Sequence, residues 1–264
     1  MDHGSHLLIA QAFCGSHSAV WIPTFSEYAD ACRLHGHRVE GISSLEKLTG
    51  NEGIFWLCNP NNPTGQTWDA ATLRRLIATY PRKLFVIDQS YALFTEKKVL
   101  SVAETVKLPN VLLLHSMTKC YAVPGLRLGA VTGSRELLSR IRACRMPWSV
   151  NALAVEAGHY LLQHPGEYRM DIQALLTERR RVTDALEALG GVEVLPTDTH
   201  YFLARLQQGT AAQLKEFLAT RHGLLIRDAS NFEGLDARYF RIAIQTEEEN
   251  NLLIEGIHEW IQNS

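Results

Sequence analysis

Several features that would mark a class of protein are scarce in this 264-residue sequence. It has only five cysteines, scattered and without a C-x-x-C pair, so we expect reduced thiols in a cytoplasmic protein rather than disulfides. Lys and Arg total 26 against 28 Asp and Glu, with no basic block, so no nucleic-acid partner is expected. No apolar run is long enough to cross a bilayer and no signal peptide opens the chain, so no membrane partner is expected either.

The short motifs of metal, nucleotide and serine chemistry are also absent or incomplete. The sequence has no G-x-G-x-x-G, no P-loop and no H-E-x-x-H. Ser116-x-x-Lys119 fits the serine–lysine pattern of β-lactamases, but neither S-D-N nor K-T-G accompanies it. His35-Gly-His37 could bind a metal, but no other ligand cluster lies near it in the sequence. We therefore expect no metal site and place these histidines in a surface turn.

What the sequence does contain is an alternation of apolar runs and helical patterns. The runs are nearly continuous, as expected for parallel strands covered on both faces. The clearest helical pattern covers residues 68–80, where Asp69 can cap the first turn and Leu73, Leu76 and Ile77 fall on one face. This alternation predicts an α/β fold with a mostly parallel sheet flanked by helices. The expected strands cover residues 19–22, 54–58, 84–87, 111–114 and 128–131.

The pattern changes near residue 150, where long helical segments come first and short strands follow. Helical spacing covers residues 152–162, 167–189, 211–220 and 247–261, and strands are expected at 192–195, 202–206, 224–226 and 240–243. This pattern predicts a smaller C-terminal α+β domain. We therefore divide the chain into a large α/β domain over residues 1–147 and a small domain over residues 148–264.

Polar side chains gather directly after three of the expected strands. The segments NPNNPTG (59–65), DQSY (88–91) and HSMTK (115–119) each follow one strand, and PGLR (124–127) comes shortly after. In an open α/β sheet, ligands bind beyond the carboxyl ends of the strands. One crevice is therefore expected to hold an amide, a carboxylate, a phenol, a hydroxyl, an amine and a guanidinium.

These stretches, in this order and with FRIAI at residues 240–244, resemble the class I and II aminotransferases, which are pyridoxal-5′-phosphate (PLP) enzymes of fold type I. The resemblance implies that Lys119 binds PLP covalently and later moves the proton on the substrate's α-carbon. It implies that Asp88 pairs with the pyridine nitrogen, which keeps the ring an electron sink. Asn62 and Tyr91 would donate hydrogen bonds to the ring's phenolic oxygen. Lys119, Asp88 and Tyr91 are thus the expected catalytic residues.

The same resemblance implies the rest of the site. Ser116 and Arg127 would hold the cofactor phosphate, since a guanidinium can bind two of its oxygens at once. Phe25 stands where the family stacks an aromatic ring on PLP, with an ordinary core phenylalanine as the alternative. Arg241 matches the arginine that binds the substrate carboxylate, with a surface ion pair as the alternative. The family also implies a homodimer.

Two further segments, at residues 146–152 and 225–235, resemble the L-threonine-O-3-phosphate decarboxylases of cobalamin synthesis, whose close relatives are the histidinol-phosphate aminotransferases. In the decarboxylases, arginines at the positions of both Arg227 and Arg241 serve the substrate. Two cations suit a small amino acid that carries a phosphate and a carboxylate. A structural contact in the small domain is the alternative for Arg227. We expect PLP-dependent decarboxylation of threonine phosphate, with histidinol-phosphate-type aminotransfer as the alternative.

The family pattern is incomplete at the N-terminus. Relatives usually carry several dozen more residues there, including a Gly-rich turn whose backbone N–H groups bind the PLP phosphate. Here residues 1–6 (MDHGSH) stand in its place, so the N-terminus is expected to be truncated. A hypothesis of a different class, in which the protein is not an enzyme, is that the chain is an inactive fragment that keeps the motifs.

Overall fold

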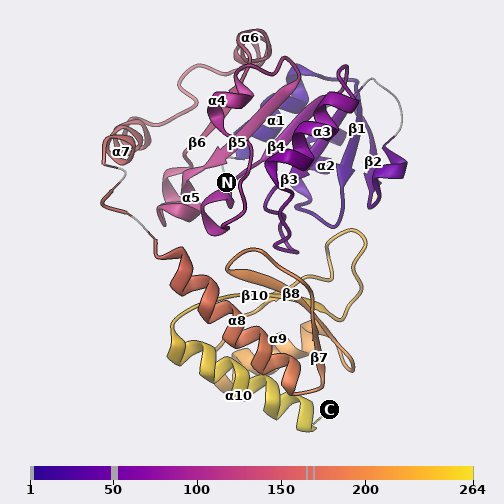
Figure 1. The fold of residues 1–264 in the computed structure, drawn as a ribbon, viewed down its shortest axis with the longest axis vertical. Coiled ribbons are helices and arrows are strands. Elements are labelled where there is room, and N and C mark those ends of the chain that lie inside the picture. The colour runs from indigo at the N-terminus through magenta and orange to yellow at the C-terminus, as the bar shows by residue number, and fades with distance from the viewer. Residues whose placement is uncertain (1–2, 49–52, 165, 169, 264) are drawn as a thin grey trace.

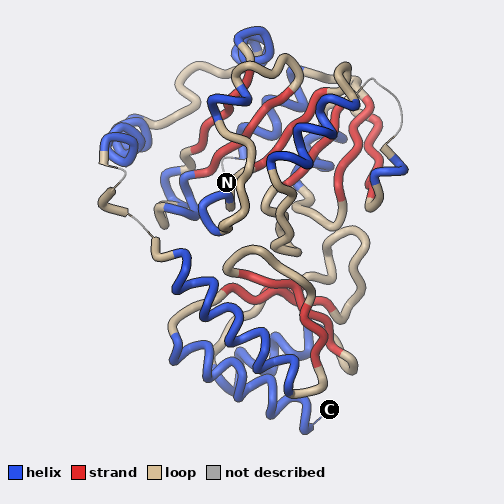
Figure 2. Tube along the Cα trace, viewed as in Figure 1, coloured by secondary structure: helices blue, strands red, loops and turns tan. Residues whose placement is uncertain are grey.

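The protein is described by a computed structural model that covers residues 3–48, 53–164, 166–168 and 170–263, so Met1 and Asp2 of the N-terminal segment lie outside it. Within these residues, one six-stranded and one four-stranded sheet form (Figure 1). Helices cover both faces of the larger sheet, and the smaller sheet lies between its own helices and the larger sheet (Figure 2). The predicted α/β fold with a smaller α+β part is confirmed. The boundary at residue 147 stays a prediction.

The large sheet is parallel except at one edge, where β6 runs antiparallel to β5. Its order, in the described part of the chain, is β2 (Arg38–Ile42), β1 (His17–Trp21), β3 (Ile54–Cys58), β4 (Leu84–Asp88), β5 (Val111–Ser116) and β6 (Gly129–Gly133). The apolar runs predicted every strand except β2. That strand lies at the edge of the sheet, and most of its residues are exposed or half-buried, so it lacks the continuous apolar run of a central strand.

The central strands are buried on both faces. Trp56 packs into one core cluster with α1 and α2, whereas its neighbours Phe55 and Leu57 pack into the other with α3. Asp69 caps α3 as predicted, its carboxylate accepting a hydrogen bond from the Thr72 N–H at 2.7 Å. The helices and 3-10 turns of this part are α1 (His3–Ala12), α2 (Glu27–Leu34), η1 (Leu45–Lys47), α3 (Ala70–Thr79), η2 (Ala92–Phe94), α4 (Val102–Thr105), α5 (Met117–Cys120), η3 (Pro124–Leu126) and α6 (Arg135–Ala143).

The prediction of a surface turn at His37 is wrong. This side chain is buried, and its ring nitrogens lie 2.8 Å from Ser18 Oγ and 2.8 Å from the Ala10 carbonyl oxygen. Because β2 begins at the next residue, His37 lies against the sheet, in contact with Ser18 of β1. Among the described residues no group of three or more His, Cys, Asp or Glu is arranged to hold a metal ion. No helix in these ranges is long and apolar enough to span a membrane.

The small sheet is antiparallel, with the order β7 (Val192–Val194), β8 (Tyr201–Leu206), β10 (Tyr239–Ala243) and β9 (Arg227–Asp228) in the described residues. The strand predicted at 224–226 is displaced to β9. The Leu224 N–H donates to the Leu218 carbonyl at 3.1 Å, closing the end of the preceding helix after Gly223, so the backbone there cannot pair with β10. The helices here are α7 (Ala152–Gln163), α8 (Ile172–Ala188), α9 (Ala211–His222) and α10 (Glu247–Asn263).

Candidate active site

A cavity of about 310 Å³ opens where the loops of the large sheet meet the small sheet. All of the predicted site residues except Asp88 and Ser116 line it, and those two border a small pocket that also holds His6 and Ser90. The cavity is lined by Phe25, Asn62, Tyr91, Lys119, Arg127, Arg227, Phe232 and Arg241. The structure therefore brings together residues that lie more than two hundred positions apart in the sequence, from Phe25 to Arg241.

The parallel strands explain why these residues meet. Asp88 is the last residue of β4 and lies beside Cys58, the last residue of β3. The backbone continues the pairing for one more step, since the Asn59 N–H donates to the Asp88 carbonyl and the Gln89 N–H to the Leu114 carbonyl, both at 2.8 Å. The polar segments that follow β3, β4 and β5 therefore leave the sheet at the same edge.

Asp88 is a buried carboxylate with a donor on each oxygen. Its Oδ1 accepts from the Ser90 N–H at 2.9 Å and the Ser90 hydroxyl at 2.5 Å, and its Oδ2 accepts from the Tyr28 hydroxyl at 2.8 Å. His6 Nε2 lies 3.4 Å from Oδ2. Burial alone raises the pKa of Asp88, but His6, Ser90 and Tyr28 outweigh it, and the pKa lies below its ordinary value. The group is therefore an anion held in a fixed orientation.

Lys119 follows directly on β5, on the short helix α5, and its side chain lines the cavity. Burial lowers the pKa of its amine, and the charges of Arg241 and Arg127 lower it further. A larger share of the amine is then uncharged at neutral pH than in an exposed lysine, which makes it a better nucleophile and base. Burial raises the pKa of the neighbouring Tyr91 to about 12, so this phenol stays protonated and can donate a hydrogen bond.

The two predicted substrate arginines form a cross-strand pair. Arg227 on β9 lies directly opposite Arg241 on β10, and both line the cavity. Arg241 donates to Asn62 Oδ1 and stacks over Tyr201, with 5.3 Å from its guanidinium carbon to the ring centre. Like charges directly opposite each other destabilise an antiparallel pair. The fold therefore holds two cations side by side at a cost in stability.

Arg227 reaches the cavity from a more exposed position and is held by local contacts. Its guanidinium donates to the Asp228 carbonyl at 2.5 Å and to Asn231 Oδ1 at 2.9 Å. Its guanidinium carbon lies 5.5 Å from the centre of the Phe232 ring. Arg227 thus makes the structural contacts within the small domain that were its alternative, and it also lines the cavity.

The remaining predicted residues surround the same space. Ser116 ends β5, and its hydroxyl oxygen lies 2.8 Å from Thr118 Oγ1. Arg127 has a left-handed backbone, with φ 53°, and its guanidinium donates to the Pro124 carbonyl at 3.1 Å. The residue is exposed and lines the cavity. Phe25 is half-buried, lines the cavity wall and also packs against the core cluster that contains Tyr28.

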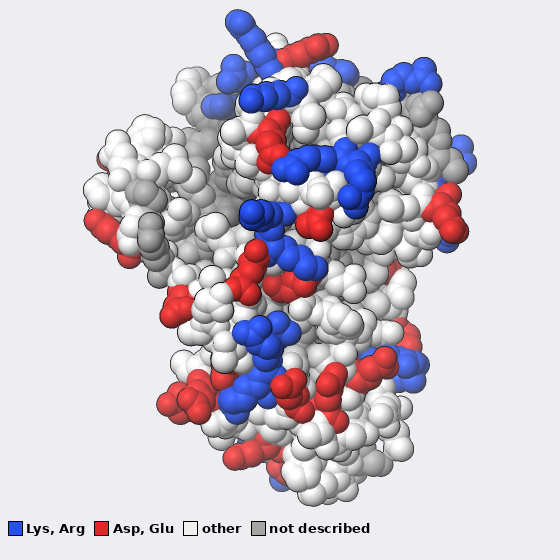
Figure 3. Space-filling model, viewed as in Figure 1, with Lys and Arg blue, Asp and Glu red and all other residues white. Residues whose placement is uncertain are grey.

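No acidic side chain is among the described residues that line this cavity, whereas one lysine and three arginines are. On the face of the molecule in Figure 3, by contrast, basic and acidic side chains lie next to one another. All the charged side chains that line the cavity are thus basic. It suits a ligand with several anionic groups.

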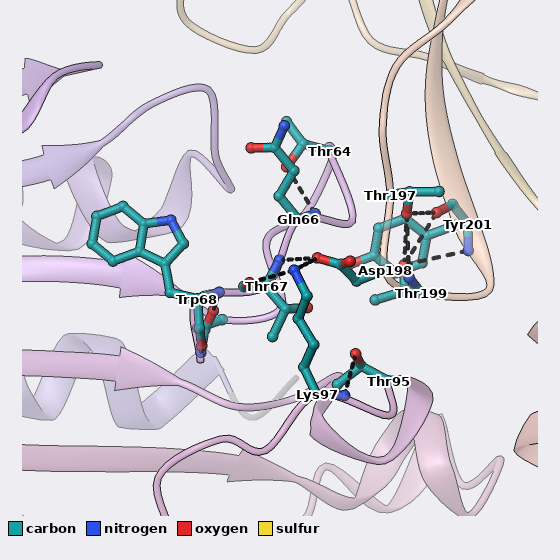
Figure 4. Close-up of polar contacts among 11 residues, drawn as sticks. Thr64, Gln66, Thr67, Trp68, Thr95, Lys97, Thr197, Asp198, Thr199 and Tyr201 are labelled. Carbon is teal, nitrogen blue, oxygen red and sulfur yellow. Dashed lines mark hydrogen bonds and ion pairs between the residues drawn. The ribbon is translucent and has the colours of Figure 1, made fainter. Parts of the chain in front are cut away.

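A polar contact between the two sheets keeps the small-sheet wall in place (Figure 4). Asp198, in the loop before β8, accepts from the Thr67 N–H and the Lys97 amine, both at 2.8 Å, and donates its own N–H to the Gly65 carbonyl at 3.0 Å. A side chain at Gly65, where φ is +74°, would come within 2.8 Å of Thr199 Oγ1. This loop is therefore docked closely on the segment that carries Asn62.

Several candidate functional residues were not predicted from the sequence. Tyr28, Ser90 and His6 reach Asp88 from three separate places in the chain. His200 stacks on Phe94 with 4.0 Å between ring centres, and burial, with the charges of Arg241 and Lys119, lowers its pKa to about 4. Ser90 could have been found from its place inside the DQSY segment. The others carry no local signal.

The residues present fit PLP. An amine of lowered pKa faces a cavity whose walls offer an aromatic ring, a phenol, an amide and a guanidinium. A buried carboxylate, the partner required by a protonated ring nitrogen, lines the small pocket that also holds Ser116. The donors and acceptors thus match the groups of the cofactor.

Comparison with known proteins agrees with this chemistry. The sequence pattern of the family described as aminotransferase class I and II matches residues 3–257. The chain is 32% identical over 251 residues to the threonine-phosphate decarboxylase of Salmonella typhimurium, covering 89% of this chain and 68% of that protein. It is 30% identical over 271 residues to the histidinol-phosphate aminotransferase of Desulfitobacterium hafniense, covering 96% and 73%.

A solved structure gives the same result. The L-threonine-O-3-phosphate decarboxylase of Porphyromonas gingivalis superposes with a TM-score of 0.95 and 38% identity, covering 99% of this chain and 82% of that one. Because the family pattern spans nearly all of the chain, the chain belongs to the class I and II aminotransferase family of PLP-dependent enzymes.

Proposed function

We propose that this enzyme decarboxylates L-threonine-O-3-phosphate to an aminopropanol phosphate, a step of cobalamin side-chain synthesis. The observation that carries the proposal is the cross-strand pair of Arg227 and Arg241 at the cavity. An amino acid with a phosphate and a carboxylate would place an anion beside each cation. The similarity to two threonine-phosphate decarboxylases supports the same reading.

We propose that the large-sheet wall holds the cofactor. Lys119 binds it covalently, Asp88 pairs with its ring nitrogen, and Asn62 and Tyr91 donate to its phenolic oxygen. Ser116 and Arg127 hold its phosphate, and Phe25 packs on its ring; these side chains line the cavity or the small pocket that holds Asp88. When bound, PLP supplies an electron sink for the pair left on the substrate's α-carbon.

The protein's own residues then act in two ways. Asp88, held by Ser90 and Tyr28, maintains a negative charge that keeps the ring nitrogen protonated. The bond from the α-carbon to the carboxylate breaks, CO₂ leaves, and Lys119 delivers a proton to the α-carbon in its place. An arginine that held the departing carboxylate as tightly in the ground state as in the transition state would give no acceleration.

The test is to supply threonine phosphate without any keto acid and to follow CO₂ release and aminopropanol phosphate. We expect one CO₂ for each threonine phosphate consumed. Threonine in place of its phosphate should be a far poorer substrate, since one cation would lose its partner.

Histidinol-phosphate aminotransfer is the second candidate. It is favoured by the 30% identity to the Desulfitobacterium hafniense aminotransferase. Here Lys119 would move the proton of the α-C–H bond instead, and 2-oxoglutarate would be converted to glutamate. Supplying histidinol phosphate with 2-oxoglutarate tests it directly. Glutamate formation without CO₂ from threonine phosphate would overturn the decarboxylase proposal and leave the PLP site intact.

We also propose that the enzyme is a cytoplasmic homodimer. The region around α7 carries large apolar side chains in solvent, among them Met146 at 73%, Trp148 at 95% and Leu153 at 77% exposure. A patch of this kind usually marks an interface. All five cysteines are free thiols, as suits a reducing compartment. Light scattering should give twice the chain mass, and Trp148→Glu should shift it toward the monomer; a wild-type monomer would contradict the proposal.

A further inference from the structure

We infer that His6 is a positioning residue that fixes the carboxylate of Asp88 for its work on the cofactor ring. The inference rests on the proposed pairing of Asp88 with the ring nitrogen. His6 lies on α1, 82 residues before Asp88, and its side chain is 3% exposed. It is therefore brought to the site by the fold and shielded from water there.

The position of the imidazole is determined by packing. The helix α1 is anchored by the buried side chains of Ile9 and Ala10, which belong to the same core cluster as Tyr28. The His6 ring meets the Tyr28 ring edge to face, with 4.9 Å between ring centres. Tyr28 in turn stacks on Trp56 with 5.9 Å between centres. His6 thus has little freedom to move away from Asp88.

The surroundings also determine which ring nitrogen carries the proton. His6 Nδ1 is buried and has no hydrogen-bond partner among the described residues. A proton there would be a buried donor without an acceptor, while Nε2 would turn a lone pair toward a carboxylate. The arrangement is satisfied when Nε2 bears a proton and donates to Asp88 Oδ2, 3.4 Å away.

The result is a carboxylate bound at both ends by different elements. Ser90 holds Oδ1 from the loop after β4, whereas His6 and Tyr28 hold Oδ2 from the two helices α1 and α2. Donors on both oxygens oppose rotation of the carboxylate and favour its charged form. A charge fixed in this way can keep a proton on a facing nitrogen without reorganising.

The experiment uses the PLP-loaded protein with ¹⁵N in the pyridine ring, so that the chemical shift reports the proton on the ring nitrogen. His6→Ala should move this signal toward the unprotonated value and lower kcat about tenfold, the loss expected for one hydrogen bond to a charged group. His6→Gln, whose amide can still donate, should recover most of the wild-type signal.

His115→Ala is the matched control. His115 lines the same small pocket and also has a buried ring nitrogen without a partner, but no hydrogen bond joins it to Asp88 in the described structure. Its replacement should leave the ¹⁵N signal and kcat within about twofold of wild type, a change smaller than a hydrogen bond is worth. An equal loss in His115→Ala, or an impaired His6→Gln, would overturn the inference.

A double variant separates this inference from the role of Asp88. In the Asp88→Asn background, His6→Ala should cause no further change in the ¹⁵N signal, because the residue through which it acts is gone. If the ring nitrogen of the wild-type enzyme is unprotonated, the proposed role of Asp88 fails. If it is protonated in both wild type and His6→Ala, Asp88 keeps its role and His6 loses its own.

Discussion

The two walls of the cavity are built in different ways. On the large-sheet side, Asp88 is the last residue of the buried strand β4 and Asn62 lies four residues after Cys58, the end of β3; they are 2% and 5% exposed. On the small-sheet wall, Arg227 is exposed and lies on a strand of two residues, held by its neighbours Asp228 and Asn231. Asp88 and Asn62 are therefore fixed by the core, whereas Lys119, Arg127 and Arg227 are exposed. Arg241 lies between them in character, because it is half-buried on an inner strand of the small sheet.

If the large-sheet wall carries the chemistry, Lys119→Ala should have the largest effect of any change. We expect kcat to fall by about four orders of magnitude, because the covalent attachment and the proton transfer are both lost. PLP should still bind weakly. Lys98→Ala, at an exposed lysine, is the control and should leave kcat unchanged. Borohydride reduction and peptide mapping should find the cofactor on Lys119, and a label on another lysine would disprove the assignment.

Asp88→Asn should have the next largest effect. An amide preserves the shape of the side chain but offers no full charge to the ring nitrogen. We expect kcat to fall by about two to three orders of magnitude, as for the loss of another preorganised electrostatic contact. The dissociation constant of PLP should change much less, because the other contacts remain. A near-normal kcat would mean that the ring lies in another orientation.

On the small-sheet wall, replacing Arg227 should lower the activity but raise the stability of the protein. Arg227→Gln should lower kcat/KM for threonine phosphate by about 10- to 100-fold, the worth of a charge-assisted hydrogen bond. It should also raise the free energy of unfolding by about 0.2–1 kcal/mol, because the like charges opposite each other are relieved. Thermal unfolding without substrate measures this. Arg238→Gln, which breaks an ion pair with Asp236, should not stabilise the protein.

The smallest expected effect is that of the Arg241 charge, on the small-sheet wall, on the Lys119 amine of the large-sheet wall. Because burial and the charges of Arg241 and Arg127 lower the pKa of Lys119, its amine loses its proton at a lower pH than a free lysine. The rate at which the cofactor-free protein takes up PLP should rise with pH, with a midpoint below the ordinary lysine value of about 10.4. Arg241→Gln should move this midpoint upward. No movement would show that the arginine charge does not reach the amine.

The sequence predicts the strands of the large-sheet wall but not the long-range contacts of the site. The strands before Asn59, Asp88 and Ser116 were visible because each is a continuous apolar run followed by polar residues. The contacts of Tyr28 and His6 with Asp88 were not visible, because they span 60 and 82 residues and depend on how α1 and α2 pack. Spacing along the chain also gave no sign that Arg227 and Arg241 face each other, since register is a property of two strands together.

The strand β9 has only two residues, and this affects how the charge at the cavity can change during evolution. Arg227 pairs with Arg241, and the next residue, Asp228, pairs with Phe240. Adjacent residues of a strand point to opposite faces, so a slip of one position would exchange what the strand presents. A single insertion or deletion in the loop before β9 could thus place a carboxylate where Arg227 now faces the cavity, with no substitution in β9 itself. Loop length, as much as residue identity, would then govern which anions this lineage of enzymes accepts.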